Sequence, residues 1–544
     1  MRKQLLAIIT ALMPFMAMAQ SMNVSVDSTG QLAIQLPDSI RYKVAELKVT
    51  GPLNGADLKL LSEIVTRTKT NKKIADECLV TSIDLSEAVI TEGRSTDGLF
   101  QLKKESMTTE ANALPASLFS GAKSLVKAVL PYNTVSIGRN CFDGCSSLTE
   151  LNIPETVTEL GNNAFSGCKA LTKMSIPKGV KAIGSGTFTE CESLAEINIP
   201  ESVRSIGSNA FRGCKSLTSI SLADDLDEIG NSAFEKCSNL KEIDINKVGK
   251  IGSNAFQECS SLEQLELEGV SKIGNGAFVK CISLKSVNIQ GNLDELGMDT
   301  FSDCSNLESV SLPSGIKKIE SRVFLNCKKL EAVELPAELT KLNDRVFEGC
   351  SSLKYIVIPN LVKSMGKSIF EDCTALDSVR IDCIIDEIDN DAFRHCHSLR
   401  TINIPISVKE IGSKAFEECV ALTSITLPVT LQSIEDDAFA KCTLLKSVII
   451  PAAVKKIGSD AFQECSSLTS VELPIGLKEI GGGAFAKCVS LREVNVKAPL
   501  PPKISRSTFK DIVSAACRFY IPQGSRMLYM QDKQWQKISQ LTER

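Results

Sequence analysis

Cysteine is the residue type with the most chemical potential in this chain, and it recurs at a nearly constant spacing. Of 20 cysteines in 544 residues, 16 lie 22 or 23 residues apart. They are Cys145, Cys168, Cys191, Cys214, Cys237, Cys259, Cys281, Cys304, Cys327, Cys350, Cys373, Cys396, Cys419, Cys442, Cys465 and Cys488. Thiols could bind a metal or form disulfides, but single cysteines at this distance are not the C-x-x-C pairs of zinc sites. The spacing therefore argues against zinc.

Disulfides are the alternative use of these cysteines. Neighbouring parallel strands lie about 4.8 Å apart, which falls within the Cα separation that a disulfide can bridge. Ala122 takes the cysteine position in the first unit, however, and this replacement is typical of a small apolar role. We favour buried free thiols that pack as small hydrophobic residues.

The two histidines of the chain, His395 and His397, flank Cys396. Two ligands rarely hold a metal, and the nearest further candidates are Asp389 and Asp391. We expect no metal there. The sequence also lacks a nucleophile–base motif, a P-loop and a dinucleotide-binding fingerprint. It therefore predicts a protein that is not an enzyme and has no catalytic residues and no cofactor.

The elements that position these residues follow from the repeat itself, which is close to A-F-x-x-C-x-S-L-x-x-I-x-I-P-x-x-V-x-x-I-G. A fixed period of this length is typical of a solenoid. The L-x-x-I-x-I segment alternates as a strand does, and the proline ends it because proline cannot donate to a strand ladder. The A-F-x-x-C segment has helical or 3₁₀ spacing.

The repeat predicts an α/β solenoid with a parallel sheet on one face and short helical or 3₁₀ arcs on the other. Phenylalanine lies three residues before every cysteine of the series, and each ring should stack on the ring of the next repeat. Glu320, Asn343, Asp389 and Glu435 replace the glycine of the I-G step. That turn should therefore not require a positive φ, which glutamate would resist.

Four regions divide the chain. Residues 1–19 have the basic start, apolar run and small-residue end of a secretory signal peptide. Residues 20–112 lack the repeat but contain strand-like and helix-like segments, and we interpret them as an N-terminal cap. The repeats occupy residues 113–497, with one degenerate first unit and 16 Phe–Cys units. Residues 498–544 hold the only tryptophan and should close the open end of the core as a C-terminal cap.

The repeat resembles the BspA-like, or treponemal-type, leucine-rich repeat of bacterial surface proteins. The resemblance lies in segments such as 193–200 (SLAEINIP) and 206–214 (IGSNAFRGC). Residues 47–55 (LKVTGPLNG) and 520–525 (YIPQGS) are similar to the end segments of members from Bacteroidales. The resemblance implies a curved leucine-rich-repeat solenoid and, for some members, adhesion to host matrix proteins or to other cells. It implies no catalytic residue and no particular ligand.

The outward position between the two strand apolars forms a column that is mostly small or acidic. Its middle is different, because Tyr355 and Val357 are followed by Arg380 and Arg400 in the next two units. Tyrosine and arginine are enriched in interface hot spots, so this patch is a candidate partner-binding site. Random variation at an exposed column is the alternative.

A second, acidic patch falls in the two shortened units. It consists of Glu242, Asp244, Glu263 and Glu266, which could attract a cation or a basic partner or form a solvated acidic face.

Charge and hydropathy limit the classes of function. The net charge is −4, and the sequence lacks the basic stripe that a nucleic-acid-binding protein needs. No segment after residue 19 is apolar enough to span a membrane. We expect an exported protein at the cell surface, secreted or periplasmic, that binds a host matrix protein, a host cell-surface protein or another bacterium. A periplasmic or envelope scaffold for the organism's own proteins is the alternative.

Overall fold

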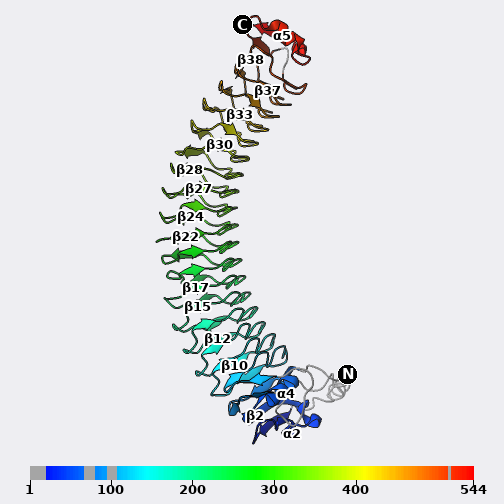
Figure 1. Cartoon of the computed structure of the whole chain (residues 1–544), viewed down its shortest axis with the longest axis vertical. Helices are drawn as coiled ribbons and strands as arrows, with labels where there is room; N and C mark the ends of the chain where they lie inside the picture. The colour runs from blue at the N-terminus through cyan, green and yellow to red at the C-terminus, as the bar shows by residue number, and fades with distance from the viewer. Residues whose placement is uncertain (1–19, 67–79, 95–106, 294, 513–515) are drawn as a thin grey trace, which may run out of the picture. The chain divides into compact units, whose positions relative to one another are not determined.

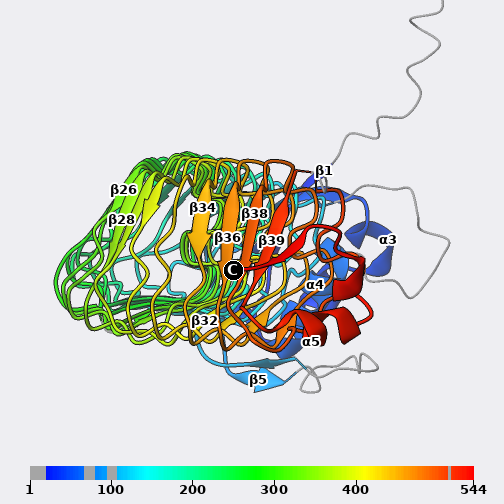
Figure 2. The same ribbon diagram turned by 90° about the horizontal axis from the view of Figure 1, so that it is seen from above.

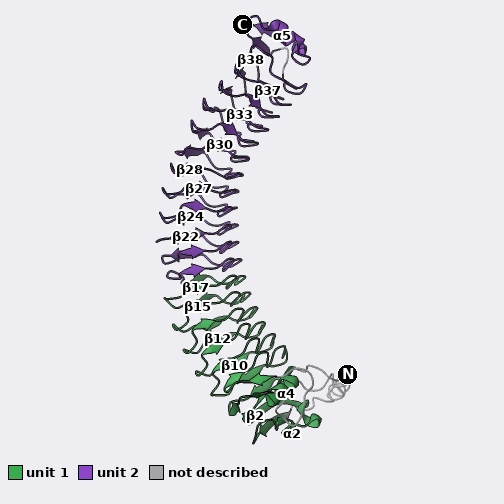
Figure 3. Cartoon of the chain, in the orientation of Figure 1, with its two compact units in different colours: residues 1–244 green, residues 245–544 purple. Residues whose placement is uncertain are grey.

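The computed structural model describes residues 20–66, 80–94, 107–293, 295–512 and 516–544. Two compact units form the chain, Met1–Asp244 and Ile245–Arg544 (Figure 3). The proposed signal peptide, residues 1–19, lies outside the described residues. Each repeat forms one coil, called a rung here, and each rung contributes a first strand from its L-x-x-I-x-I segment and a short second strand from its V-x-x-I segment (Figure 1).

In the first unit, the strands of both columns pair in parallel with those of neighbouring rungs. The first strands are β8 (Lys127–Val129), β10 (Glu150–Asn152), β12 (Lys173–Ser175), β14 (Glu196–Asn198), β16 (Ser219–Ile220) and β18 (Glu242–Ile243). The second strands are β7 (Ala113–Leu114), β9 (Ser136–Ile137), β11 (Glu159–Leu160), β13 (Ala182–Ile183), β15 (Ser205–Ile206) and β17 (Glu228–Ile229). They form short sheets such as β12-β14 and β7-β9-β11.

The second unit repeats this arrangement with the same parallel register. Its first strands are β20 (Gln264–Leu267), β22 (Ser286–Ile289), β24 (Ser309–Ser311), β26 (Ala332–Val333), β28 (Tyr355–Ile358), β29 (Ser378–Ile381), β31 (Thr401–Ile402), β34 (Ser447–Ile449), β36 (Ser470–Leu473) and β38 (Glu493–Val496). Its second strands are β19 (Lys250–Ile251), β21 (Lys272–Ile273), β23 (Glu295–Leu296), β25 (Lys318–Ile319), β27 (Lys341–Leu342), β30 (Glu387–Ile388), β32 (Glu410–Ile411), β33 (Ser433–Ile434), β35 (Lys456–Ile457) and β37 (Glu479–Ile480).

The core of both units is a column of phenylalanine rings, as the repeat predicts. Neighbouring ring centroids are 5.2 Å apart for Phe211 and Phe234 and 5.5 Å apart for Phe347 and Phe370, with nearly parallel planes. The side opposite the sheet consists of turns rather than regular 3₁₀ helices. The N–H of Cys145 donates to the carbonyl of Phe142, three residues earlier, and a separate turn follows in which the N–H of Leu148 donates to the carbonyl of Cys145. The expected arcs are therefore single 3₁₀-type turns, each also hydrogen-bonded to the next rung.

Glycine in the I-G step has a negative φ, as expected from its replacement by glutamate. Its role is close packing, since a Cβ on Gly207 would lie 2.7 Å from the backbone nitrogen of Ser185. The left-handed conformation occurs instead at the residue before many of the cysteines, for example at Gly167 (φ 68°) and Glu190 (φ 56°). Asparagine and glycine suit such positions, and other residues adopt them at a conformational cost.

The N-terminal end of the first unit is closed by strands β1 (Gln20–Ser25), β2 (Val44–Leu53), β3 (Ser82–Asp84) and β4 (Ala88–Ile90) and by helices α2 (Leu32–Gln35), α3 (Asp38–Arg41) and α4 (Gly55–Thr66). The sheet runs in the order β1-β2-β3-β8-β10, so the end strands continue the rungs. Asp57 is buried at the start of α4 and accepts hydrogen bonds from the N–H groups of Gly30, Leu32 and Asn54. Strands β5 (Gly93–Arg94) and β6 (Thr108–Thr109) form a small antiparallel pair.

The C-terminal end of the second unit is closed by β39 (Arg518–Ile521), β40 (Leu541–Glu543), α5 (Arg526–Gln531) and the 3₁₀ turn η1 (Trp535–Lys537). Viewed along the stack, β34, β36, β38 and β39 lie side by side and α5 lies beside them (Figure 2). Trp535 is fully buried and its Nε1 donates to the carbonyl of Pro502 at 2.7 Å. The Tyr529 hydroxyl, also buried, donates to the carbonyl of Ala498 at 2.6 Å.

Candidate functional site

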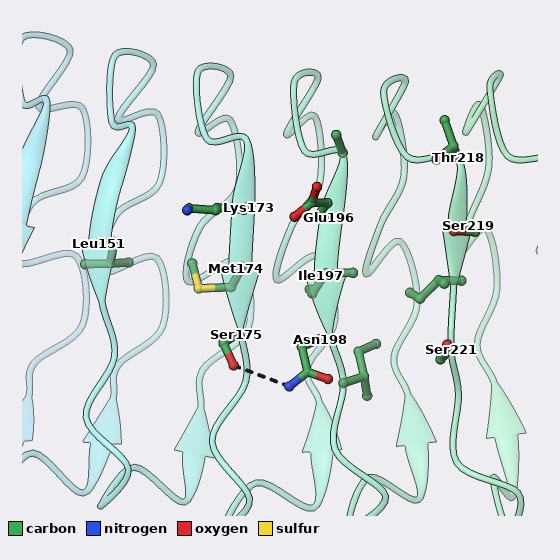
Figure 4. Close-up of a pocket in the computed structure, with 13 residues that line it drawn as sticks. Leu151, Lys173, Met174, Ser175, Glu196, Ile197, Asn198, Thr218, Ser219 and Ser221 are labelled. Carbon is green, nitrogen blue, oxygen red and sulfur yellow. Dashed lines mark hydrogen bonds between the residues drawn. The ribbon is translucent and has the colours of Figure 1, made fainter.

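The sheet face of the first unit carries an open groove of about 710 Å³ over strands β12, β14 and β16 (Figure 4). Lys173 and Glu196 lie opposite each other in register at one end of these strands. Ser175 and Asn198 lie at the other end, where the Asn198 Nδ2 donates to the Ser175 Oγ at 3.5 Å. The residues that line the groove include serines, one lysine and one glutamate, Lys173 and Glu196, but neither histidine nor cysteine.

A second hollow of about 720 Å³ adjoins the groove on the turns that follow the same strands. It shares Ser175, Asn198, Ile199 and Ser221 with the first and adds the charged residues Glu155, Lys178 and Glu201. The two serines and Asn198 belong to the outward column of the strands, and the sequence analysis predicted no hollow there. Short serine and asparagine side chains on adjacent rungs were the available signal, because they leave space between longer neighbours.

The predicted partner-binding patch lies on three consecutive rungs of the second unit. Tyr355 is 47% exposed, and Val357 is the register partner of Arg380. The Arg380 guanidinium binds the Asp382 carboxylate through two nitrogens, at 2.6 and 3.0 Å, and this hydrogen bonding raises the pKa of Arg380. Both arginines of the patch are thus already paired with carboxylates of this chain, because Arg400 binds Asp377.

The Arg400 Nη1 lies 2.6 Å from Asp377 Oδ1. The pair is exposed, so a partner carboxylate could exchange with Asp377 at little cost. The structure brings the four patch residues onto one face, and their binding role stays a prediction.

The acidic residues divide between the two units. In the first unit, Glu242 and Asp244 lie exposed on and beside β18. In the second unit, Glu263 pairs with Lys285 at 2.9 Å, and Glu266 accepts a hydrogen bond from Asn288 at 2.7 Å. The latter two carboxylates therefore have partners within the chain.

The two histidines lie on the turn side of the second unit, and their carboxylate neighbours come from other rungs. His395 Nδ1 is 2.8 Å from Asp372 Oδ1, and His397 Nε2 is 3.6 Å from Glu418 Oε2. The sequence analysis offered Asp389 and Asp391 as nearby candidates, and these contacts are instead with Asp372 and Glu418. A residue's neighbours on this side are the equivalent residues one rung away, 23 positions earlier or later.

Among the described residues, one group of at least three side chains has the composition of a metal site: Glu371, Asp372 and His395, with ligand atoms within 4.8 Å of one another. Glu371 is already bound by Arg394 at 3.0 Å, so this group forms part of an ion-pair network. A hydrogen bond from Lys441 likewise lowers the pKa of Glu418.

The cysteine series is a column of buried free thiols in the described residues, as favoured from the sequence. Each thiol also has a hydrogen-bond acceptor that the sequence did not indicate. The Cys304 Sγ, for example, donates to the carbonyl of Phe278 at 3.2 Å. Burial raises the pKa of Cys237 and of Cys281 to about 12, so these thiols stay protonated and are neither nucleophiles nor metal ligands at neutral pH.

Stacked parallel strands, one per rung, over a continuous apolar core define a leucine-rich-repeat solenoid. A family model described as "BspA type Leucine rich repeat region (6 copies)" matches residues 112–205, 181–308, 271–400 and 386–515. The chain belongs to this family. The described residues contain no helix long and apolar enough to cross a bilayer.

The comparison with solved structures found several bacterial proteins. A leucine-rich repeat protein from Bacteroides ovatus is 27% identical, with a TM-score of 0.47 over 80% of this chain and 99% of its own. A leucine-rich cell surface protein from Faecalibacterium prausnitzii is 25% identical, with a TM-score of 0.37 over 62% of this chain and 91% of its own. The pneumococcal vaccine antigen PcpA is 19% identical, with a TM-score of 0.30 over 81% and 96%. A search of curated proteins found no match.

Proposed function

We propose that this is an exported, surface-associated protein that binds a protein partner on its sheet face without catalysis. The observation that carries the proposal is the polar, hollowed sheet face of the first unit, with grooves of about 710 and 720 Å³. Solenoids of this kind use extended sheet surfaces for binding. Its serine, asparagine and threonine side chains offer hydrogen bonds to a partner.

The test uses residues 20–544 immobilised on a surface and exposed to host matrix proteins, mucin and whole cells. We expect saturable binding to at least one of them. Asn198→Trp should fill the groove and raise the Kd at least tenfold, equal to about 1.4 kcal/mol. Lys487→Ala, on the turn side, is the matched control and should leave the Kd unchanged. Absence of saturable binding to all three classes contradicts the proposal.

The patch around Tyr355 and Arg380 gives the second arm of the same experiment. Joint replacement of both residues by alanine removes an exposed ring and an exposed guanidinium without touching the core. If the partner uses this patch, the Kd should rise roughly tenfold. An unchanged Kd removes the patch from the binding site while leaving the groove as the candidate.

Surface location is tested separately, because an envelope scaffold for the organism's own proteins has the same fold. Protease treatment of intact cells should degrade a surface-exposed protein and spare a periplasmic one. Protection of this chain in intact cells, with degradation after permeabilisation, would favour the scaffold.

A further inference from the structure

The turn after each first strand presents two residues at its tip. The N–H of Val454 donates to the carbonyl of Pro451 at 3.1 Å, which closes the turn and leaves Ala452 and Ala453 between them. We call these two middle positions the turn tip. Where the second tip residue is serine or threonine, its hydroxyl binds the preceding rung, as Ser407 binds the carbonyl of Ile385 at 2.6 Å. The first tip residue then faces solvent.

Six consecutive rungs of the second unit carry an exposed aliphatic residue at one of the two tip positions. It is the second position in the rungs of Leu361 and Ile384 and the first position in the other four. The exposed fractions of the five larger residues lie between 52% for Leu361 and 78% for Ile384. We call this row the apolar ridge, and it consists of Leu361, Ile384, Ile406, Val429, Ala452 and Ile475. The turns that carry it lie between β28 and β37 in the chain, and Figure 1 labels several strands of this stretch.

A single exposed isoleucine is ordinary, but a contiguous row of them marks an interaction surface. The other rungs show that the turn does not require an apolar tip. Their tips carry exposed charged residues, including Glu155, Lys178, Glu201, Asp224, Lys247 and Glu338. Since the same turn accepts lysine and glutamate elsewhere, the aliphatic row of the second unit is not needed for folding.

A row of charged residues runs parallel to the ridge, at the start of the second strands. The register Glu387–Glu410–Ser433–Lys456–Glu479 aligns the row across neighbouring rungs. The rung of Ile384 carries two acids, Asp386 and Glu387, whereas the rung of Ala452 carries two bases, Lys455 and Lys456.

The acidic pair and the basic pair lie at equal distances from the middle of the ridge, with two rungs, those of Ile406 and Val429, between them. Both pairs make exposed ion pairs within the chain, Asp386 with Lys409 at 3.3 Å and Lys456 with Glu435 at 2.7 Å, which a partner's charges could replace at little cost. Consider a second copy of the chain related to the first by a two-fold axis that lies in the interface and crosses the ridge at right angles at its middle. The rungs of the second copy then run in the opposite order. Asp386 and Glu387 of each copy then face Lys455 and Lys456 of the other.

The spacing of the rungs favours the same partner. Successive Phe rings beneath the ridge are 5.1 to 5.4 Å apart. The ridge of a second copy of the chain has the same spacing between rungs. In the antiparallel arrangement the two ridges therefore meet rung by rung: the rung of Ile406 in one copy faces the rung of Val429 in the other, and the rung of Leu361 faces that of Ile475. Interfaces in which the same patch of both copies meets about a two-fold axis are the commonest in homo-oligomers.

We infer that the apolar ridge binds the ridge of a second copy of this chain in antiparallel orientation, forming a two-fold symmetric dimer. The ridge lies on turns of the second unit, whereas both hollows of the proposed binding surface lie in the first unit, so the dimer contact is separate from them. Apolar contacts along the ridge supply affinity, and the charged rows select the antiparallel register.

The test is sedimentation velocity on residues 20–544 over a wide concentration range. We expect a reversible monomer–dimer equilibrium. Ile406→Asp with Val429→Asp should raise the dimer dissociation constant at least tenfold while the circular dichroism spectrum and the thermal midpoint stay unchanged. Glu201→Asp, at a tip of the first unit, is the control and should leave the equilibrium unchanged. A chain that is monomeric at every concentration overturns the inference, including the case in which the ridge serves a different partner.

The orientation is tested by exchanging the charges. Asp386→Lys with Glu387→Lys places like charges opposite each other and should weaken the dimer severalfold at low salt. Adding Lys455→Glu and Lys456→Glu restores opposite charges in the antiparallel dimer alone, so the fourfold variant should recover the wild-type equilibrium. Failure of this rescue, with the fold intact, overturns the proposed arrangement.

Discussion

The two compact units differ in what their turn tips present, although the columns beneath them are alike. In the first unit the tips after Pro154, Pro177 and Pro200 carry Glu155, Lys178 and Glu201. In the second unit six successive tips are aliphatic and exposed. Tyr132 is an exception in the first unit, because the turn after Pro131 carries this aromatic residue, 65% exposed, where the later turns carry charged residues. Most of these turns begin with proline and end with an inward aliphatic residue in both units. The tip residues can therefore vary without affecting the core, and their differences can serve binding.

The largest effect should come from the core that the units share. Phe211→Ala in the first unit and Phe347→Ala in the second each remove a fully buried ring stacked on both sides. Each should lower the unfolding free energy by about 3–5 kcal/mol. Urea unfolding followed by circular dichroism measures this. A loss that differs severalfold between the units would show that their cores are not equivalent.

The next effect concerns the tips themselves. Ile406→Asp with Val429→Asp should change the dimer dissociation constant at least tenfold, or about 1.4 kcal/mol, and leave monomer stability unchanged. Transferring the ridge sharpens the comparison: Lys178→Ile with Glu201→Ile in the first unit should fold normally, with an unfolding free energy within about 0.5 kcal/mol of wild type. A large loss of stability on this transfer would mean that the tips are constrained by the fold.

A smaller effect is expected in the thiol column. Cys191→Ala and Cys304→Ala each remove a hydrogen bond to a phenylalanine carbonyl of the preceding rung. The net contribution of such a bond is about 1 kcal/mol, and alanine fits the position because Ala122 occupies it naturally. Chemical denaturation gives the stability change, and thiol titration in denaturant should find nearly all cysteines reduced. Few free thiols in denaturant would instead indicate disulfides between rungs.

The smallest effect is the pH dependence of the ion pair on the turn side. The hydrogen bond from Lys441 lowers the folded-state pKa of Glu418. A lowered carboxyl pKa stabilises the fold above the unfolded-state value, near 4.3, and this stabilisation is lost as the pH falls through the folded-state value. Lys441→Gln should therefore reduce stability at pH 7 by less than about 1 kcal/mol and have less effect at pH 3. An equal effect at both pH values would show that the pair is not electrostatic in origin.

Much of the fold followed from the repeat, because its contacts are periodic. The inward direction of Phe and Cys and the parallel strands were predicted from residue spacing. The helix-like segment expected within residues 20–112 corresponds to α4. The partners of His395 were missed, because Asp372 lies 23 residues away and reaches it only through the stacking of rungs.

The candidate surfaces were predicted less well than the core. The outward column identified Ser175 and Asn198 as surface residues, but a groove depends on the relative heights of side chains on adjacent rungs. Tyr355 and Arg380 were placed on one face correctly, yet the pairing of Arg380 with Asp382 depends on side-chain conformation at the end of β29.

The sequence by itself determined the architecture of this protein, since a period of 22 or 23 residues with one inward phenylalanine and cysteine per turn leaves one way to bury them all. Tertiary structure decided which outward residues are neighbours. Leu361 and Ile475 lie more than 100 residues apart in the chain, and they belong to one ridge only because successive rungs stack on one another in register. Surface chemistry in a solenoid is therefore organised along the stack rather than along the chain.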